Sequence, residues 1–395
     1  MKLSVTSFVF LAVLMAGCAS EPGSNGTQSA PESTTMSASI VVAPTLYMVN
    51  VDQLQLRDQP SKNGSAVLKK CTEGTFLFGT GKRSSTKEEA VLRGIPYQDV
   101  FVEVQTLDSP SITGWLFAPG LTGIYVGPKE NGPDLNKVAA FTTYLKTLPT
   151  KSLQSGGKAW KYVESQFGNA SGPLADAVYI LLNQFLFRME VEGEYYNQVE
   201  AMPWTEEDYR AIQKDQFDLQ KYPESRAFHQ NGFRLEVGEG TVYPVADWQR
   251  LYDFFGPKVS PVMKRYLDQE VVEMREVETE DAGIVIPIEQ IAERAVFWER
   301  FNLENPTFVL SDQTQISARW TRELLFFGAD NTPLFDFETK QIQPEFKAAW
   351  QLVQEKYPGT QVAQKCEGIS ALCAANGWKY TKEIEKWVAT NQEQR

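Results

Sequence analysis

A glutamate near the end of a helix-like segment is the first residue in this chain whose type and position could do chemistry. Glu164 begins the sequence ESQF at 164–167, which closes a stretch with helical spacing of apolar residues. A carboxyl at such a place can act as a general acid if burial raises its pKa enough to hold a proton near neutral pH. The alternative is an ordinary helix terminus with Glu164 in solvent.

The ESQF sequence resembles the Glu-Ser-x-Phe motif of lytic transglycosylases, which cut peptidoglycan and use the glutamate as general acid. The resemblance implies a helical domain in which Glu164 is the acid. The chain departs from the family after Phe167, where AS at 170–171 replaces Ala-x-Ser and the Gly-Leu-Met-Gln segment is absent. A carboxylate-type cell-wall lytic enzyme is therefore the alternative function, and a non-catalytic protein is the leading expectation.

The sequence contains few residues that could support histidine-dependent catalysis or metal binding. His229 is the only histidine, and no G-x-S-x-G sequence accompanies it, so we expect an ordinary loop residue. One histidine excludes multi-histidine metal sites, and no Cys-x-x-Cys pair occurs. We expect neither a metal nor a cofactor. The five acidic residues within 271–283 favour a solvated acidic face.

The chain has four cysteines, which fall into three groups. Cys18 belongs to the N-terminal segment discussed below. Cys71 stands in a strand-like segment, where a buried small hydrophobic residue is the simplest interpretation. Cys366 and Cys373 lie seven residues apart and could form a disulfide across a turn between two helices, since a cell envelope can be oxidising.

The first 18 residues have the pattern of a secretory signal. Lys2 precedes an apolar run from 3 to 14 that is too short to span a membrane comfortably. The run ends in LMAGCAS, which resembles a bacterial lipobox and implies cleavage before Cys18 and lipid modification of that cysteine, palmitate included. The alternative is an ordinary signal cut near Ala19. Because Ala19 is not Asp, the resemblance implies an outer-membrane anchor facing the periplasm or the surface.

Residues 19–44 are rich in Ser, Thr, Gly and Pro, which is typical of a flexible tether. The formal net charge of the chain is −12. Since phosphate backbones bind to basic surfaces, this charge argues against a nucleic-acid partner. The membrane contact that we expect is the lipid at Cys18, which the lipobox resemblance implies.

Residues 45–127 predict a small β-barrel. Apolar and polar residues alternate with period two in several short runs separated by turn signals. The sequences LQLRD at 54–58, PS at 60–61 and GWL at 114–116 resemble, in their order and spacing, the Src-homology-3-like (SH3-like) family of bacterial envelope domains. The chain departs from that family in a long insert at 82–99. The resemblance implies a barrel that binds peptidoglycan or a protein peptide, with Arg57, Tyr97 and Trp115 in its groove.

From residue 134 to 392 the apolar spacing becomes helical. Asp134 is placed to cap the first helix, Pro173 to begin a long apolar helix, and Thr205 to cap a third. The predicted fold class is therefore α+β, with a small SH3-like barrel followed by a large, mostly α-helical domain. The expected function is a non-catalytic binding or scaffold role at the cell envelope, with peptidoglycan or an envelope protein as partner.

Overall fold

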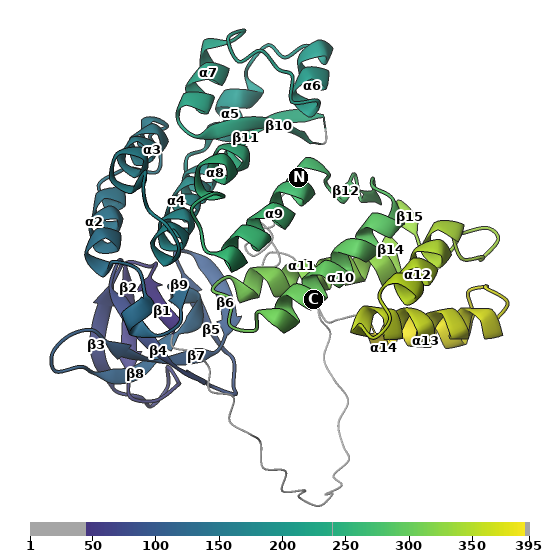
Figure 1. Cartoon of the computed structure of the whole chain (residues 1–395), viewed down its shortest axis with the longest axis horizontal. Helices are drawn as coiled ribbons and strands as arrows, with labels where there is room; N and C mark the ends of the chain where they lie inside the picture. The colour runs from purple at the N-terminus through teal and green to yellow at the C-terminus, as the bar shows by residue number, and fades with distance from the viewer. Residues whose placement is uncertain (1–44, 239, 392–395) are drawn as a thin grey trace, which may run out of the picture. The chain divides into compact units, whose positions relative to one another are not determined.

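The computed structural model describes residues 45–238 and 240–391, which divide into two compact units (Figure 1). The sheet unit comprises the described residues up to Lys129, and the helical unit begins at Glu130. The fold is α+β, with an antiparallel sheet within residues 45–126 followed by a largely helical region. The signal segment, Cys18 and the tether at 19–44 lie outside the described residues.

The sheet unit is built on one antiparallel sheet with the strand order β3-β2-β8-β7-β4-β1-β9. Within the described residues its outermost strands, β3 and β9, do not pair, so hydrogen bonds do not close the sheet into a barrel. A short 3₁₀ helix at Ala118–Gly120 links β8 to β9. The strands are β1 (Thr45–Val49), β2 (Gln53–Arg57), β3 (Val67–Thr72), β4 (Phe76–Arg83), β7 (Phe101–Thr106), β8 (Thr113–Phe117) and β9 (Leu121–Val126).

Alternating side chains supply the core of this unit, as the period of two predicts. In β2, Leu54 and Leu56 are buried whereas Gln53 is exposed. Cys71 belongs to the same core, and its burial raises the pKa of its thiol. The interpretation of Cys71 as a buried small residue is therefore confirmed.

The segment at 82–99 includes a second, two-stranded ribbon of the sheet unit. Strands β5 (Glu88–Leu92) and β6 (Ile95–Asp99) pair along their whole length. Arg93 and Gly94 connect them with positive φ angles of 49° and 81°. A two-residue turn with both φ angles positive matches the right-handed twist of a hairpin. The sequence does not indicate this turn, because arginine, unlike asparagine or aspartate, is unusual at a turn position with a positive φ angle.

A short 3₁₀ turn at Lys129–Asn131 spans the boundary in the sequence between the two units, and the helical unit continues as a series of helices interrupted by short hairpins. Its helices are α2 (Leu135–Lys146), α3 (Gln154–Phe167), α4 (Pro173–Glu192), α5 (Tyr195–Glu200), α6 (Glu206–Gln213), α7 (Pro223–Gln230), α8 (Trp248–Phe255), α9 (Pro261–Arg275), α10 (Ile288–Glu304), α11 (Ser311–Phe327), α12 (Pro344–Lys356), α13 (Gln361–Ala375) and α14 (Lys382–Asn391).

The helix starts follow the capping signals in the sequence. The Asp134 side chain accepts hydrogen bonds from the first turn of α2, and Pro173 occupies the first position of α4. Thr205 caps α6. Helix α4 buries residues on every side, because its sequence is apolar nearly all round. These predicted elements are therefore confirmed.

The longest hairpin of the helical unit pairs β10 (Phe233–Gly238) with β11 (Thr241–Ala246). Helices α5, α6 and α7 pack against this hairpin (Figure 1). The remaining hairpins are very short: β12 (Thr279–Glu280) pairs with β13 (Gly283–Ile284), and β14 (Gly328–Ala329) pairs with β15 (Thr332–Pro333).

The expected disulfide between Cys366 and Cys373 is absent, and the helix they share explains why. Both residues lie within α13, and both thiols are buried and unbonded. Seven residues of α-helix rise about 10 Å, whereas bonded cysteines need Cα atoms within about 7 Å. The turn that we expected between them does not exist, and both side chains instead fill the core of the C-terminal helices.

None of the helices in the described ranges combines the length and the apolarity that are needed to cross a membrane.

Candidate functional site

Two of the three residues predicted for the groove of the sheet unit are direct neighbours. Arg57, at the end of β2, pairs with Trp115 of β8. The two strands approach closely because residue 114 is glycine: a Cβ atom there would lie 2.6 Å from the Arg57 carbonyl oxygen. The Arg57 guanidinium donates to the Ser65 hydroxyl at 2.9 Å and to the Lys62 carbonyl at 3.2 Å. It therefore also holds the loop that follows β2.

Trp115 and Tyr97 are both half-buried against the core of the sheet unit. Burial raises the pKa of the Tyr97 phenol. Tyr97 belongs to the β5–β6 ribbon, whereas Arg57 and Trp115 belong to the large sheet. Each aromatic ring thus has a packing role, and its exposed part is what remains for a ligand.

Glu164 lies on α3 and faces Arg250 of α8. The Arg250 Nη2 atom is 3.0 Å from Glu164 Oε1, and the glutamate side chain is 49% exposed. The same guanidinium stacks on Trp160, with its Cζ atom 4.2 Å from the ring centre. Glu164 is therefore held in a half-exposed ion pair, whereas the general acid of a glycosidase lies in an apolar setting.

Glu164 and His229, which are far apart in the sequence, line one open recess of about 500 Å³. We call it the Glu164 hollow. His229 lies near the end of α7 rather than in the expected loop. Its Nδ1 atom is 3.6 Å from Asp247 Oδ2, beyond hydrogen-bond distance, and Asp247 caps α8 instead. The other lining residues that the structure describes are Trp160, Asp247, Gln249, Arg250, Asp253 and Phe254, so no hydroxyl or thiol nucleophile of the described chain lines this hollow.

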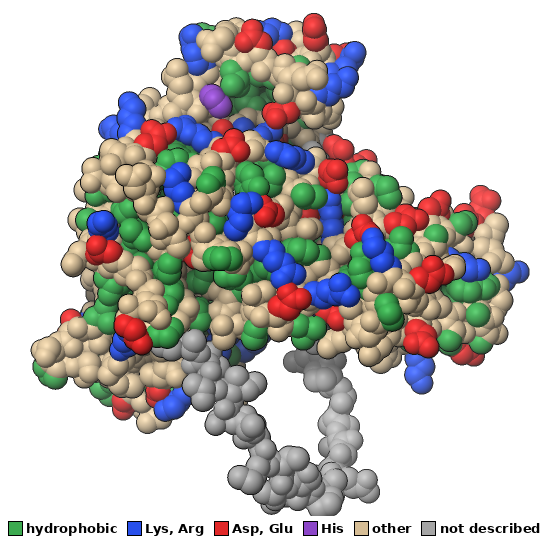
Figure 2. All heavy atoms as spheres, in the orientation of Figure 1, with side chains coloured by type: hydrophobic (Ala, Val, Ile, Leu, Met, Phe, Trp, Pro, Cys, Tyr) green, Lys and Arg blue, Asp and Glu red, His purple; other side chains and the backbone are tan. Residues whose placement is uncertain are grey.

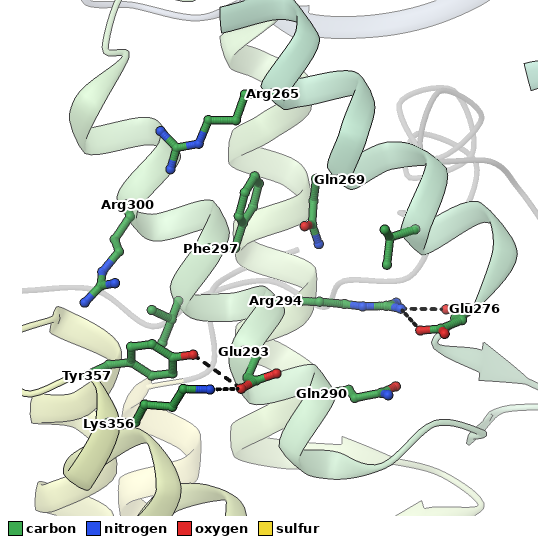
Figure 3. Close-up of a pocket in the computed structure, with 12 residues that line it drawn as sticks. Arg265, Gln269, Glu276, Gln290, Glu293, Arg294, Phe297, Arg300, Lys356 and Tyr357 are labelled. Atoms are coloured by element: carbon green, nitrogen blue, oxygen red, sulfur yellow. Dashed lines mark hydrogen bonds and ion pairs between the residues drawn. The ribbon is translucent and has the colours of Figure 1, made fainter. Parts of the chain in front are cut away.

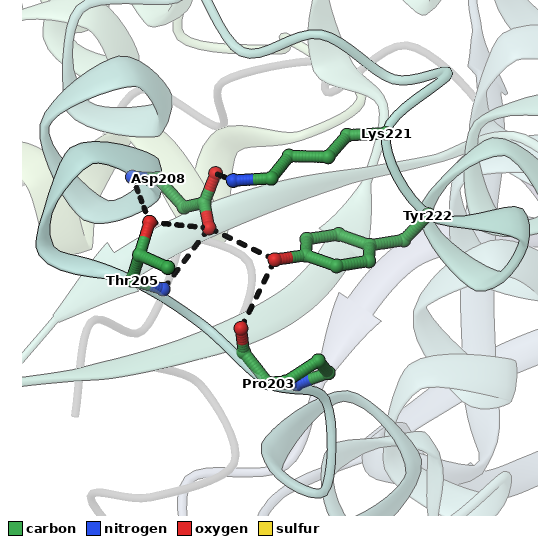
Figure 4. Close-up of polar contacts among 5 residues, drawn as sticks. All are labelled: Pro203, Thr205, Asp208, Lys221 and Tyr222. Carbon is green, nitrogen blue, oxygen red and sulfur yellow. Dashed lines mark hydrogen bonds and ion pairs between the residues drawn. The ribbon is translucent and has the colours of Figure 1, made fainter.

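A second group of polar side chains surrounds Asp208 and is structural (Figure 4). Asp208 Oδ2 accepts from the Thr205 backbone nitrogen at 3.0 Å and from the Tyr222 hydroxyl at 3.0 Å, while Lys221 donates to Oδ1. Desolvation opposes ionisation, but these hydrogen bonds outweigh it and lower the pKa of Asp208 to about 2. The group fixes the start of α6 against the segment before α7.

The second hollow of the helical unit lies among α9, α10 and the end of α12 (Figure 3). Its volume is about 490 Å³, and we call it the α9–α10–α12 hollow. Its side chains follow one stripe of α9 and one stripe of α10 at helical spacing. The lining residues are Arg265, Gln269, Val272, Glu276, Gln290, Glu293, Arg294, Val296, Phe297, Arg300, Lys356 and Tyr357.

Ion pairs occupy the lower part of this hollow as drawn in Figure 3. Lys356 Nζ lies 2.6 Å from Glu293 Oε1, and the Tyr357 hydroxyl donates to the same oxygen at 3.3 Å. Arg294 donates from Nη2 to the Glu276 carbonyl at 2.9 Å and pairs with its carboxylate. These contacts fix the side chains in place, and the hollow beside them has the volume of a small-molecule site.

Buried carboxyls lie near this hollow, which the sequence did not indicate. Glu270 and Glu273 are buried and the Glu278 side chain is only 11% exposed, so residues 271–283 do not form the fully solvated acidic face that we expected. Trp298 Nε1 donates to Glu273 at 2.8 Å, and Arg294 Nη1 lies 3.3 Å from Glu278. Burial raises the pKa of all three carboxyls, that of Glu270 to about 7.

The expectation of a solvated face at 271–283 was wrong because some acidic side chains of this run face the core and others face solvent. Glu276, between the buried glutamates, has a side chain that is 54% exposed. A signal was available in the helical spacing of Glu270 and Glu273 with Tyr266 on one face of α9. The described residues contain no group of three or more His, Cys, Asp or Glu side chains that could hold a metal ion.

Comparisons with known proteins leave this chain without an assigned relative. No family model matches it, and neither a curated protein nor a solved structure is significantly similar to it. The two hollows and the sheet unit therefore have to be interpreted from their own geometry and chemistry.

Proposed function

We propose that the chain is a lipid-anchored protein of the bacterial cell envelope with a non-catalytic binding or scaffold role. Cys18 carries the lipid, residues 19–44 form the tether, and the sheet unit is an SH3-like module that binds peptidoglycan or a protein peptide. The helical unit docks a further envelope component. The lipobox-like LMAGCAS sequence, with Ala19 after the cysteine, supports an anchor in the outer membrane that faces the periplasm or the surface.

The pairing of Arg57 with Trp115 is the observation that carries this proposal. The two SH3-like motifs are distant in the sequence, one in β2 and the other in β8, yet they meet on adjacent antiparallel strands. A module in which both motifs contribute to one groove needs this adjacency. Arginine and tryptophan are also residue types that concentrate binding energy at interfaces.

The surroundings of Glu164 support a non-catalytic role. Its carboxylate is half-exposed and paired with Arg250, whereas a general acid of a glycosidase needs an apolar setting that favours the protonated form. The rival proposal remains a lytic enzyme with Glu164 as acid, because this residue does line an open hollow.

Co-sedimentation of the full-length chain with purified peptidoglycan sacculi tests the proposal. We expect the chain to pellet with sacculi and Arg57→Gln to lose most of the bound fraction, because a charged donor beside Trp115 is removed. Lys87→Gln, an exposed residue in the same unit, is the charge-matched control and should bind as wild type does.

The same experiment separates the alternatives. If sacculi do not bind, a photo-crosslinking residue at Tyr97 should still capture an envelope protein, which identifies the protein-peptide ligand. Failure of both arms contradicts the proposal. Release of soluble muropeptides from the sacculi, abolished by Glu164→Gln, would establish the enzyme instead.

A further inference from the structure

The α9–α10–α12 hollow gathers cationic side chains in a chain whose net charge is −12. Four cationic side chains line it, against two carboxylates. Lys356 is balanced by Glu293, and Arg294 by Glu276 and the buried Glu278. Two positive charges, on Arg265 and Arg300, therefore remain without a carboxylate inside the hollow.

Arg300 is the cation most available to a ligand. It is exposed, and within the described ranges no carboxylate lies within ion-pair distance of it. Its guanidinium rests against Tyr357, with the Cζ atom 5.0 Å from the ring centre. Stacking on an aromatic ring orients the planar guanidinium and leaves its N–H groups free to donate.

Arg265 supplies the second donor from α9. Its Cζ atom lies 5.4 Å from the ring centre of Phe297, and both residues lie above the ion pairs in the view of Figure 3. It also pairs with Glu304, but that carboxylate is about half-exposed and does not line the hollow. An exposed pair of this kind contributes little to stability, so a ligand anion can compete for the guanidinium.

We propose that the α9–α10–α12 hollow binds a small organic anion whose carboxylate or phosphate accepts hydrogen bonds from Arg265 and Arg300. The apolar part of the ligand lies against Phe297. A volume of about 490 Å³ suits a small molecule. A long polyanion is disfavoured, because Glu276 and Glu293 also line the hollow and would repel it.

This site is independent of the peptidoglycan or peptide proposed for the sheet unit. It lies wholly in the helical unit and uses none of the residues tested there. Loss of one binding activity therefore leaves the other unaffected, and the two proposals fail separately.

Calorimetric titration of the full-length chain with citrate and, separately, with inorganic phosphate tests the proposal. Ionic strength is held constant with chloride, so that general screening does not change. We expect saturable binding of at least one anion. Arg300→Gln should weaken it by at least about tenfold, because a charge-assisted hydrogen bond is lost. Arg300→Lys should weaken it less, since the charge remains but the planar fork is lost.

Arg226→Gln is the matched control, because Arg226 is also an exposed helical arginine of the same unit without a carboxylate partner in the described chain. It should bind as wild type does. Binding of citrate alone identifies a carboxylate ligand, and binding of phosphate alone identifies a phosphate ligand. The proposal is overturned if neither anion saturates, or if Arg226→Gln weakens binding as much as Arg300→Gln.

Discussion

Glu270 shows how a single carboxyl can make the stability of this chain depend on pH. One of its oxygen atoms, Oε1, is buried without a hydrogen-bond partner, and the side chain lies near Tyr266 and the carboxyl of Glu278. Glu273, from the same helix, and Arg294, from α10, complete the charged surroundings. Burial is the main cause that raises the pKa of Glu270, to about 7.

The raised pKa predicts a loss of stability as pH increases. The protonated carboxyl is favoured in the folded chain, so the associated stability is fully present below the unfolded pKa of about 4.5 and is lost as pH rises through about 7. A shift of this size corresponds to about 3 kcal/mol. Glu270→Gln mimics the neutral form, so urea unfolding should show it more stable than wild type at pH 8 and similar to it at pH 5.

Glu276→Gln is the control for that prediction, because Glu276 is about half-exposed on the same segment. Its unfolding free energy should follow the wild-type pH dependence. If Glu270→Gln follows that dependence as well, the Glu270 carboxyl is not the group that titrates between pH 5 and pH 8.

Among the secondary-structure elements, the helix starts were the features that the sequence predicted best, through their capping residues. Thr205 and Asp208 form a reciprocal pair at the start of α6: the Thr205 hydroxyl accepts from the Asp208 nitrogen at 3.3 Å, and the Asp208 carboxylate accepts from the Thr205 nitrogen. Such a capping box is a local feature, so a short stretch of sequence is sufficient to predict it.

Thr205→Ala should destabilise the helical unit by about 1 kcal/mol, because the hydroxyl that caps α6 is removed. Chemical unfolding monitored by circular dichroism measures this loss. Thr307→Ala, at an exposed loop position of the same unit, should have no comparable effect. Equal effects of the two substitutions would mean that the cap does not contribute to stability.

Features that depend on distant residues could not be predicted in this way. The sequence predicted Glu164 at a helix end but not its partner Arg250, since the pair joins α3 to α8. The α9–α10–α12 hollow likewise needs the packing of three helices before Arg265 and Arg300 can be recognised as one site. The Arg93-Gly94 turn could not be predicted for a local reason: arginine rarely adopts a positive φ angle.

For the whole molecule, the change from alternating to helical periodicity predicted where one type of structure gives way to the other. The described residues divide between Lys129 and Glu130, within the polar segment VGPKENGPD. A long run of one period is informative because each unit buries its own apolar side chains: β2 contributes to one core, and α10 and α13 to another. Periodicity does not show whether either unit binds a ligand, since binding depends on a few exposed side chains.

The buried cysteines give each unit a chemical reporter of its own transient opening. Cys71 lies in the sheet unit, whereas Cys366 and Cys373 lie in the helical unit. Burial raises the pKa of Cys366 to about 12 and that of Cys373 to about 11, so both thiols should resist alkylation until α13 is exposed. Mass spectrometry after brief labelling can therefore time the opening of each unit separately.

Alkylation in denaturant extends the same chemistry to the lipid proposed at Cys18. The sequence holds four cysteines, so a chain that keeps Cys18 and carries no lipid should take up four alkyl groups in denaturant. If Cys18 carries a thioether-linked lipid, only Cys71, Cys366 and Cys373 remain to react, and we expect three. A count of four on protein extracted from membranes would contradict lipidation. Counting alkylated cysteines would thus report both the transient opening of each unit and whether Cys18 is free to react.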